Sequence, residues 1–318
     1  MELDSFLAEL GIENTQQPQE VSDEEALDSL VASLNGLQES IDRFQETNTE
    51  PVTTEEANNP VEETQETINN EPTLKKIQIY NDDSARFSGA EWFDAITNQK
   101  AAIIGLGGIG SWLTLLLSRL KLSAIYCQDM DTVESVNLAG QLYNNSHIGM
   151  FKTQALRDIV SQFNRYRPYI YTDNSEFTTD SRISLVAPFS VFLALDSITA
   201  RKNVYNYWKK KQSLYSLPSI LIDGRLTADK WQIFAIPFND KKRMKVYEEE
   251  WLFPESEAQQ LRCSFKQTTY MAAMIASYMC NLFVNYVAEC TKPIVPYSVP
   301  FMTEFDAQTL TRTIYECD

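Results

Sequence analysis

Three glycines, Gly105, Gly107 and Gly110, have a spacing through which this chain could hold phosphate groups. They follow the apolar run 101–104 and precede the helix-compatible segment 111–117. In a strand–turn–helix unit, the first glycine permits the tight bend, the second lets phosphate oxygens approach the backbone, and the third lets helix and strand pack closely. The positive end of the helix then faces the phosphates. The spacing predicts a nucleotide-binding loop; the alternative is a glycine turn that serves packing alone.

Two carboxylates follow apolar runs and could complete such a site. Asp129 ends the predicted strand 124–128 and lies 24 positions after Gly105, close to the roughly 20 positions expected of a ribose-binding acid. Asp196 ends the continuous apolar run 190–195, which is typical of a strand buried on both faces. Each acid could instead cap a helix or close a turn. Ligands bind at the carboxyl ends of parallel strands, so the placement that the two acids share favours a binding site.

Strands and helices alternate through the middle of the chain. Predicted strands cover 101–104, 124–128, 169–171, 190–195 and 219–223, and predicted helices cover 89–96, 152–160 and 198–211. This alternation predicts an α/β fold with a Rossmann-like, doubly wound and mainly parallel sheet.

The pattern changes after Asp223. The sequence predicts a strand over 231–237, a charged loop over 239–260, one long helix over 264–288 and a hairpin over 294–315, so the C-terminal strands should be antiparallel. The uncharged stretch within the long helix could span a membrane by length. Polar residues are spread through it, and they favour a buried helix packed along the sheet; these residues are Gln267, Ser277, Asn281 and Asn285.

The first 74 residues form a separate, acidic region. They hold 19 Asp and Glu residues against the single Arg43, whereas the whole chain has a net charge of −17. Such a composition predicts a mostly disordered arm over 1–74, followed by a globular domain over 75–318. A short amphipathic helix is expected over 27–44; it could dock into a partner's groove, fold back on its own domain or self-associate. The negative charge predicts neither nucleic acid nor an anionic membrane as partner.

The cysteines and the histidine restrict the chemistry further. Five cysteines occur without a C-x-x-C pair and without a secretory leader: Cys127, Cys263, Cys280, Cys290 and Cys317. This pattern predicts reduced thiols in a cytoplasmic protein and excludes a four-cysteine zinc site. Cys280 and Cys290 are expected in the core. His147 is the single histidine and is expected in a loop, which leaves little for histidine-based metal or triad chemistry.

A longer signature follows the second predicted strand. Residues 129–141 read DMDTVESVNLAGQ, and Gly149 and Lys152 follow at a G-x-x-K spacing. The block resembles D-x-D-T-V-x-x-x-N-L-x-R-Q of the ThiF/MoeB/HesA family, the ATP-dependent adenylating enzymes that also gave rise to the ubiquitin-activating enzymes. The resemblance is specific over about 100–200 and looser over the long helix and hairpin, where the chain looks similar to phage-encoded members. It does not cover the acidic arm.

The resemblance implies a site for ATP and Mg²⁺. It implies that Gly105, Gly107 and Gly110 hold the phosphates, Asp129 the ribose and Asn137 a phosphate oxygen, that Lys152 neutralises phosphate charge, and that Asp196 ligates Mg²⁺. Attack of a carboxylate on the α-phosphate builds negative charge, which cations must stabilise while the metal orients the pyrophosphate leaving group.

The chain departs from the family pattern at two arginines. Gly140 stands in place of the arginine before the final glutamine of the block, and Gly89 stands in place of the second arginine of an early R-x-x-R-Q motif. Arg86 keeps the first position of that motif, and Arg225 could supply charge from another direction; both could also be ordinary surface or packing residues. Losing charge aimed at a transition state commonly costs about two to three orders of magnitude in rate, so turnover is affected more than binding.

Cys263 is a further candidate for chemistry. It lies between the predicted charged loop and long helix, where the family often places a thiol that forms an acyl or sulfur-transfer intermediate. A helix amino terminus with Arg262 and Lys266 beside it would favour the thiolate. The alternative is a small buried residue at the start of a helix.

Together these features predict adenylation of a carboxylate, with the C-terminus of a ubiquitin-like or sulfur-carrier protein or peptide as substrate and transfer to Cys263 as an option. The family usually forms homodimers, and Arg86 would then serve the neighbouring subunit's site. One rival is a non-catalytic, nucleotide-binding adaptor that recruits a partner through its arm. The other is an NAD-dependent oxidoreductase, which the Asn137 and Lys152 block and the shortage of histidine disfavour.

Overall fold

The protein is described here by a computed structural model. It describes residues 86–165, 168–178, 181, 190–212, 218–254, 267–291 and 293–317. The predicted arm and Cys263 lie outside these ranges.

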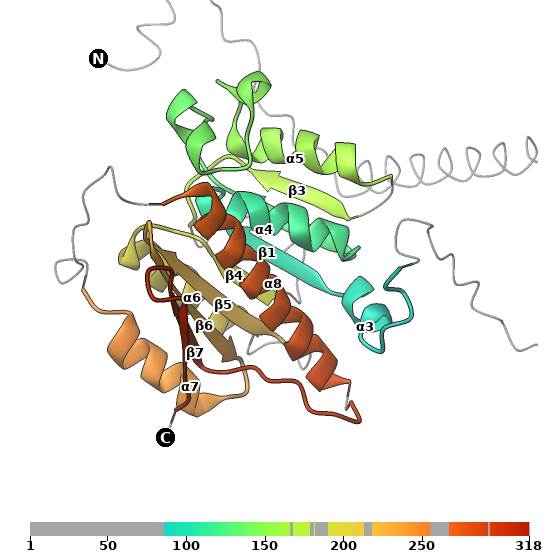
Figure 1. The fold of residues 1–318 in the computed structure, drawn as a ribbon, viewed down its shortest axis with the longest axis vertical. Coiled ribbons are helices and arrows are strands. Elements are labelled where there is room, and N and C mark those ends of the chain that lie inside the picture. Colours follow the sequence, from blue (N-terminus) through green and yellow to red (C-terminus); the bar gives the residue numbers. More distant parts are fainter. Residues whose placement is uncertain are drawn as a thin grey trace, which may run out of the picture. The chain divides into compact units, whose positions relative to one another are not determined.

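A mixed sheet of eight strands organises the described residues, in the order β3-β2-β1-β4-β5-β6-β7-β8 (Figure 1). Its strands are β1 (Lys100–Ile104), β2 (Ala124–Gln128), β3 (Tyr169–Asp173), β4 (Ser190–Leu193), β5 (Ile220–Leu226), β6 (Lys230–Pro237), β7 (Met302–Asp306) and β8 (Thr311–Tyr315). Neighbouring strands from β3 to β5 pair in parallel, and those from β5 to β8 pair antiparallel. This confirms the predicted doubly wound, mainly parallel sheet with C-terminal antiparallel strands. The order of β3, β2, β1 and β4 reverses between β1 and β4, where such folds bind ligands.

Helices cover both faces of the sheet. They are α3 (Phe93–Thr97), α4 (Gly108–Arg119), α5 (Lys152–Phe163), α6 (Ile198–Gln212), α7 (Lys241–Val246) and α8 (Thr269–Cys290), with shorter turns η2 (Ser135–Ala139), η3 (Asn145–His147) and η5 (Tyr247–Trp251). Successive strand residues point to opposite faces. Ile103 therefore packs into the core under α4, α5 and α8, whereas Ala102 and Ile104 pack under α6, α7 and η5.

The long helix α8 is long and apolar enough to cross a membrane by length and composition alone. In the structure it packs against α4, β5 and β6 (Figure 1), and ten of its 22 residues are buried. Half of its most apolar window is covered by the rest of the domain. The helix therefore packs along the sheet, as predicted, and supplies the core of one face.

The prediction of a charged loop over 239–260 is wrong, because α7 and η5 occupy its first half. The Asp240 side chain caps α7 by accepting a 3.0 Å hydrogen bond from the Arg243 N–H. Met244 and Tyr247 are buried against the sheet, and the Trp251 ring packs against the Phe234 ring at a tilted angle. These apolar residues recur every three or four positions, but the charged residues between them hide the helical period.

Other element boundaries also differ from those predicted. The lead-in helix begins at Phe93 instead of residue 89, and the long helix begins at Thr269 and continues to Cys290. The predicted strand 219–223 extends to Leu226. Cys290 is exposed at the end of α8, contrary to its expected place in the core. His147 is buried within a turn, where its Nδ1 accepts a hydrogen bond from the Asn144 N–H.

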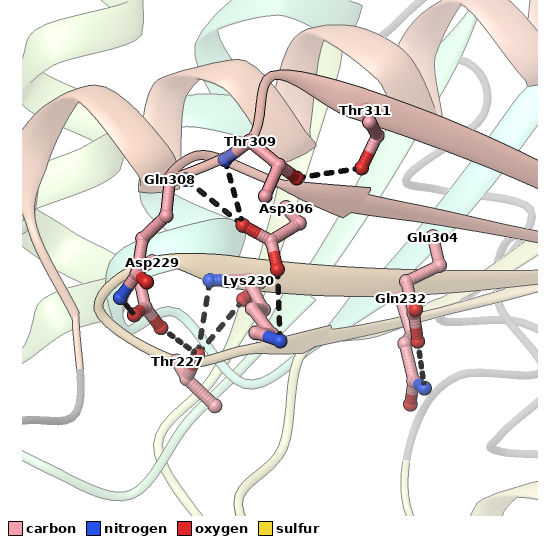
Figure 2. A network of polar contacts seen from close by, with 9 residues as sticks. All are labelled: Thr227, Asp229, Lys230, Gln232, Glu304, Asp306, Gln308, Thr309 and Thr311. Atoms are coloured by element: carbon pink, nitrogen blue, oxygen red, sulfur yellow. Dashed lines mark hydrogen bonds and ion pairs between the residues drawn. The ribbon is translucent and has the colours of Figure 1, made fainter.

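The C-terminal hairpin closes through polar contacts at its tip (Figure 2). Lys230, at the start of β6, lies 2.8 Å from the carboxylate of Asp306 at the end of β7. The same carboxylate accepts hydrogen bonds from the Gln308 and Thr309 N–H groups. The two strands of the hairpin, β7 and β8, pair antiparallel as predicted.

Candidate nucleotide site

The glycine loop needs its glycines at two positions for different reasons. Gly105 follows β1 with φ +88°, a left-handed conformation that side chains rarely adopt, and a Cβ there would lie 2.5 Å from the Ala194 oxygen. A Cβ at Gly110 would collide with the Gly105 carbonyl oxygen. Gly107 caps α4 without any side-chain hydrogen bond to the first turn. The turn is therefore tight, and the amino end of α4 carries no internal side-chain cap.

Asp129 ties the end of β2 to this loop. One of its carboxylate oxygens accepts a 2.6 Å hydrogen bond from the Leu106 N–H, and the other accepts a 2.9 Å bond from the Asp131 N–H. Burial raises the pKa of the Asp129 carboxyl, and the nearby Lys152 ammonium and the backbone donors oppose that shift. The side chain is only 10% exposed. Asp129 thus fixes the loop and holds a desolvated carboxylate beside it.

Lys152 reaches the same place from the start of α5. Its Nζ atom lies 3.8 Å from Asp129 Oδ1 and 2.6 Å from Asp131 Oδ2. Its backbone N–H donates to the Asp131 oxygen, which fixes the first turn of α5 to the segment after β2. The lysine side chain is 7% exposed, whereas that of Asp131 is 55% exposed. A buried cation therefore lies next to the loop acid.

Asp196 lies in the turn that follows β4, at the same edge of the sheet. The Ala194 N–H donates a 2.9 Å hydrogen bond to the Ile104 oxygen, and this places the chain after β4 against Gly105. Asp196 follows two residues later and is exposed. Arg201 donates a hydrogen bond to the Leu195 oxygen and fixes this turn. Asp129 and Asp196 therefore follow β2 and β4, the two strands that flank β1 and its glycine loop.

Asn137 lies in η2 and takes part in a local cap. Its side-chain oxygen accepts a 2.9 Å hydrogen bond from the Glu134 N–H. The amide NH₂ group is the part that the side chain could offer to a phosphate oxygen.

Arg86 and Arg225 have different surroundings in the structure. Arg86 is exposed, and the next residue, Phe87, packs its ring against Trp92 and Phe93 beside α3. The helix α3 leads into the amino end of β1, whereas the glycine loop follows the carboxyl end (Figure 1). Arg225 pairs with the buried Asp223 at 2.9 Å and lies over the Phe234 ring. These contacts give Arg225 a packing role in the core under η5.

The sequence predictions missed several polar residues around the loop. Tyr143 donates a 2.7 Å hydrogen bond to the Leu106 oxygen, and Ser111 Oγ accepts one from the Leu142 N–H. Burial raises the pKa of the Tyr143 hydroxyl well above its usual value. Residues 142–143 directly follow the signature block, and this is the one signal that could have indicated them.

The reversal of strand order, the glycine loop and the acid after β2 define a Rossmann-like nucleotide-binding fold. The chain belongs to the ThiF family: the sequence model of that family matches residues 80–317. This confirms the resemblance noted in the sequence.

Named relatives agree with this assignment. The molybdopterin-synthase adenylyltransferase of Salmonella typhimurium is 28% identical over 146 residues, which cover 44% of this chain and 56% of that protein. A ubiquitin-like modifier-activating enzyme 5 of Oryza sativa is 27% identical over 149 residues, covering 45% of this chain and 34% of that protein. The matched segment thus spans about half the length of these relatives or less.

A solved structure shares the fold. The crystal structure of the E. coli tRNA N6-threonylcarbamoyladenosine dehydratase, TcdA, in complex with ATP aligns with a TM-score of 0.51 and 16% identity. The alignment covers 66% of this chain and 93% of that chain. At this identity the likeness concerns the fold alone.

Proposed function

We propose that this chain binds Mg-ATP at the glycine loop and adenylates a carboxylate. The observation that carries the proposal is the junction at Asp129. Its carboxylate bonds to the loop N–H of Leu106 and lies 3.8 Å from the ammonium of Lys152. Three separate segments thus bring together a glycine loop, an acid and a buried cation.

The residues present fit a nucleoside triphosphate. At Gly107 the atom nearest to a Cβ would be Gln141 Nε2 at 3.8 Å, so phosphate oxygens could approach the backbone at that glycine. Lys152 would neutralise phosphate charge, Asn137 would donate its amide N–H to an oxygen, and Asp129 would accept from the ribose. Each carboxylate oxygen of Asp129 accepts one backbone hydrogen bond and keeps a further lone pair, which could accept from a ribose hydroxyl.

The donor set also fits Mg²⁺. No group of three or more His, Cys, Asp or Glu residues suited to a metal occurs within the described ranges. Mg²⁺ in such sites is commonly held by one or two carboxylates together with substrate phosphates and water. Asp196, exposed beside the loop, would be that carboxylate. The metal would supply charge stabilisation for the pyrophosphate leaving group.

In the proposed reaction, a carboxylate oxygen forms a bond to the α-phosphorus of ATP. The bond from that phosphorus to the bridging oxygen of the β-phosphate breaks, and pyrophosphate leaves with its electron pair. The products are an acyl adenylate and pyrophosphate. Lys152 would stabilise the charge that builds on the phosphate oxygens, in a site with little water.

The substrate is proposed from the relatives. Adenylyltransferases and ubiquitin-like modifier-activating enzymes among them favour the C-terminus of a small ubiquitin-like or sulfur-carrier protein or peptide. Cys263 is the proposed acceptor in a following step, and it precedes Gln267 by four positions. In a homodimer, Arg86 would complete the partner's site. In its own chain it precedes α3, which leads into the amino end of β1, whereas the glycine loop follows the carboxyl end.

A second candidate function is a nucleotide-binding adaptor without turnover. The missing cation at Gly140 favours it. Gly140 stands in place of the family's arginine, and the side chain beside it is that of the neutral Gln267. Such a protein would recruit its partner through the acidic arm over 1–74.

The test combines partner capture with an exchange assay. The chain with and without residues 1–74 is used to capture partners, and each recovered carrier is assayed for ATP–pyrophosphate exchange. Carrier-dependent exchange supports adenylation. Thermal stabilisation by Mg-ATP without exchange on any recovered carrier supports the adaptor, and stabilisation by NAD but not by Mg-ATP contradicts both.

A further inference from the structure

We propose that Gln267, supported by Gln141, is a phosphate-contacting residue that selects nucleotides by their number of phosphates. The two amides would replace a cation at the glycine loop. This inference rests on the proposed nucleotide site, and it concerns which residues grip the phosphates.

The side chain of Gln267 lies across two glycines. A Cβ at Gly108 would collide with Gln267 Oε1 and would lie 2.8 Å from its Cδ. A Cβ at Gly140 would lie 3.0 Å from Nε2 and 3.2 Å from Cγ. The amide therefore fills the space between the first turn of α4 and the end of η2, where side chains on either glycine would have stood.

The backbone around Gln267 is held in place by its neighbours. Thr269 donates a hydrogen bond to the Ala139 oxygen, and Thr268 donates a 3.4 Å bond to the Ala228 oxygen. Gln267 directly precedes Thr268, the cap residue of α8. The amide is thus presented by the fixed end of a 22-residue helix, so its reach toward the loop is set by the fold.

Gln141 supplies an independent indication of a missing ligand. Its side chain is only 9% exposed, and its Oε1 atom has no hydrogen-bond partner in the described part of the chain. Its Nε2 atom would lie 3.8 Å from a Cβ at Gly107, so the amide is directed at the loop. A buried polar atom without a partner is unfavourable, and an amide can turn to present either its oxygen or its NH₂ group. A bound nucleotide would supply the missing partner.

Neutral amides and an arginine would hold phosphates differently. An amide donates hydrogen bonds without a net charge, whereas a guanidinium adds a fixed positive charge. Because Lys152 is, among the described residues, the one cation beside the loop acid and is shared between Asp129 and Asp131, neutral N–H donors would complete the grip on a triphosphate. Placing a negative charge at position 267 would then penalise each additional phosphate of the ligand.

The test is a set of equilibrium titrations of the full chain with ATP, ADP and AMP in Mg²⁺. Gln267→Glu keeps the size of the side chain and adds one negative charge. We expect the Kd for ATP to rise about 100-fold, because charges a few ångströms apart near a protein surface interact strongly. The Kd for ADP should rise less, and that for AMP about threefold or less. Gln267→Arg should lower the Kd for ATP.

Controls separate this effect from a loss of structure. Gln162→Glu makes the same charge change in the last turn of α5, ten residues or ~15 Å along that helix from Lys152, and should leave all three Kd values unchanged. If Gln267→Glu unfolds, Gln267→Met removes the amide without adding charge, and it should raise the Kd for ATP several-fold more than the Kd for AMP.

Two results would overturn the inference. One is an unchanged Kd for ATP in Gln267→Glu or Gln267→Met, and the other is an equal loss of affinity for ATP and AMP, which would indicate a structural role. Failure of the unmodified chain to bind ATP at all would instead contradict the proposed function, so the two outcomes are distinct.

Discussion

Asp129 at the glycine loop and Asp306 at the hairpin tip have nearly the same bonding partners. Each accepts two backbone hydrogen bonds, and each lies beside one lysine. Their pKa values nevertheless shift in opposite directions: burial raises that of Asp129, whereas the hydrogen bond from Lys230 lowers that of Asp306. The lysines differ accordingly, since Lys152 is 7% exposed and Lys230 is 56% exposed.

The difference shows what separates the proposed binding edge from a structural turn in this fold. At the hairpin tip, contacts between partly exposed side chains satisfy the charges, and the network closes on itself (Figure 2). At the loop, the side chains of Asp129 and Lys152 are largely buried. Electrostatic interactions are stronger in such surroundings, so the charge of a ligand would interact strongly with both groups. The same residue types thus stabilise a turn in one place and form the proposed site in the other.

The largest expected effect is at the loop backbone. Gly110→Ala places a Cβ against the Gly105 carbonyl oxygen, and overpacking of this kind typically costs about 1–3 kcal/mol. We expect a lower melting temperature and a loss of Mg-ATP binding, measured by thermal denaturation and titration. Gly89→Ala is the matched control, because nothing lies within 4 Å of a Cβ there. Equal melting temperatures and equal affinities for the two variants would contradict the packing argument.

The next effect concerns the proposed metal ligand. Asp196→Asn should raise the Mg²⁺ concentration needed for half-maximal exchange and slow exchange by about 100-fold, because a metal supplies several kcal/mol of charge stabilisation. Asp229→Asn makes the same change in the turn between β5 and β6, where Asp229 accepts a hydrogen bond from Gln308 of the hairpin tip, and should leave exchange unchanged. A Mg²⁺ dependence that is the same in both variants would remove Asp196 from the metal site.

The smallest effect is a pH dependence of stability with opposite signs for the two acids. Unfolded Asp titrates near ~3.9. Because the folded pKa of Asp129 is raised, the free energy of unfolding of the native chain relative to Asp129→Asn should fall as pH rises from the unfolded value through the folded one. For Asp306, whose folded pKa is lowered, the stability relative to Asp306→Asn should be lost as pH falls through the folded value. Denaturant titrations at a series of pH values measure both; slopes of the same sign would contradict the burial argument.

Much of the fold could be predicted because its signals are local. Apolar runs bounded by glycine or acid mark β1, β2 and β4, and the glycine spacing marks the start of α4. The helix α7 escaped prediction because charges separate Met244, Tyr247 and Trp251. Burial against the sheet, rather than local composition, makes that segment helical.

The site could be predicted only in part. Asp129 and Lys152 belong to one signature block, so their proximity follows from a recognisable pattern. Gln267 approaches Gly108 and Gly140 from a distant segment, because α8 packs on α4. No local sequence pattern predicts this contact. The opposite behaviour of Asp129 and Asp306 likewise depends on burial, which the neighbouring residues in the sequence do not reveal.

The buried lysine beside Asp129 is proposed to grip a nucleoside triphosphate. Calorimetric titration of Mg-ATP into the native chain, Lys152→Ala and Lys230→Ala in the same buffer tests this grip. We expect saturable binding that is lost in Lys152→Ala and unchanged in Lys230→Ala. Equal affinity of the native chain and Lys152→Ala for Mg-ATP would contradict it.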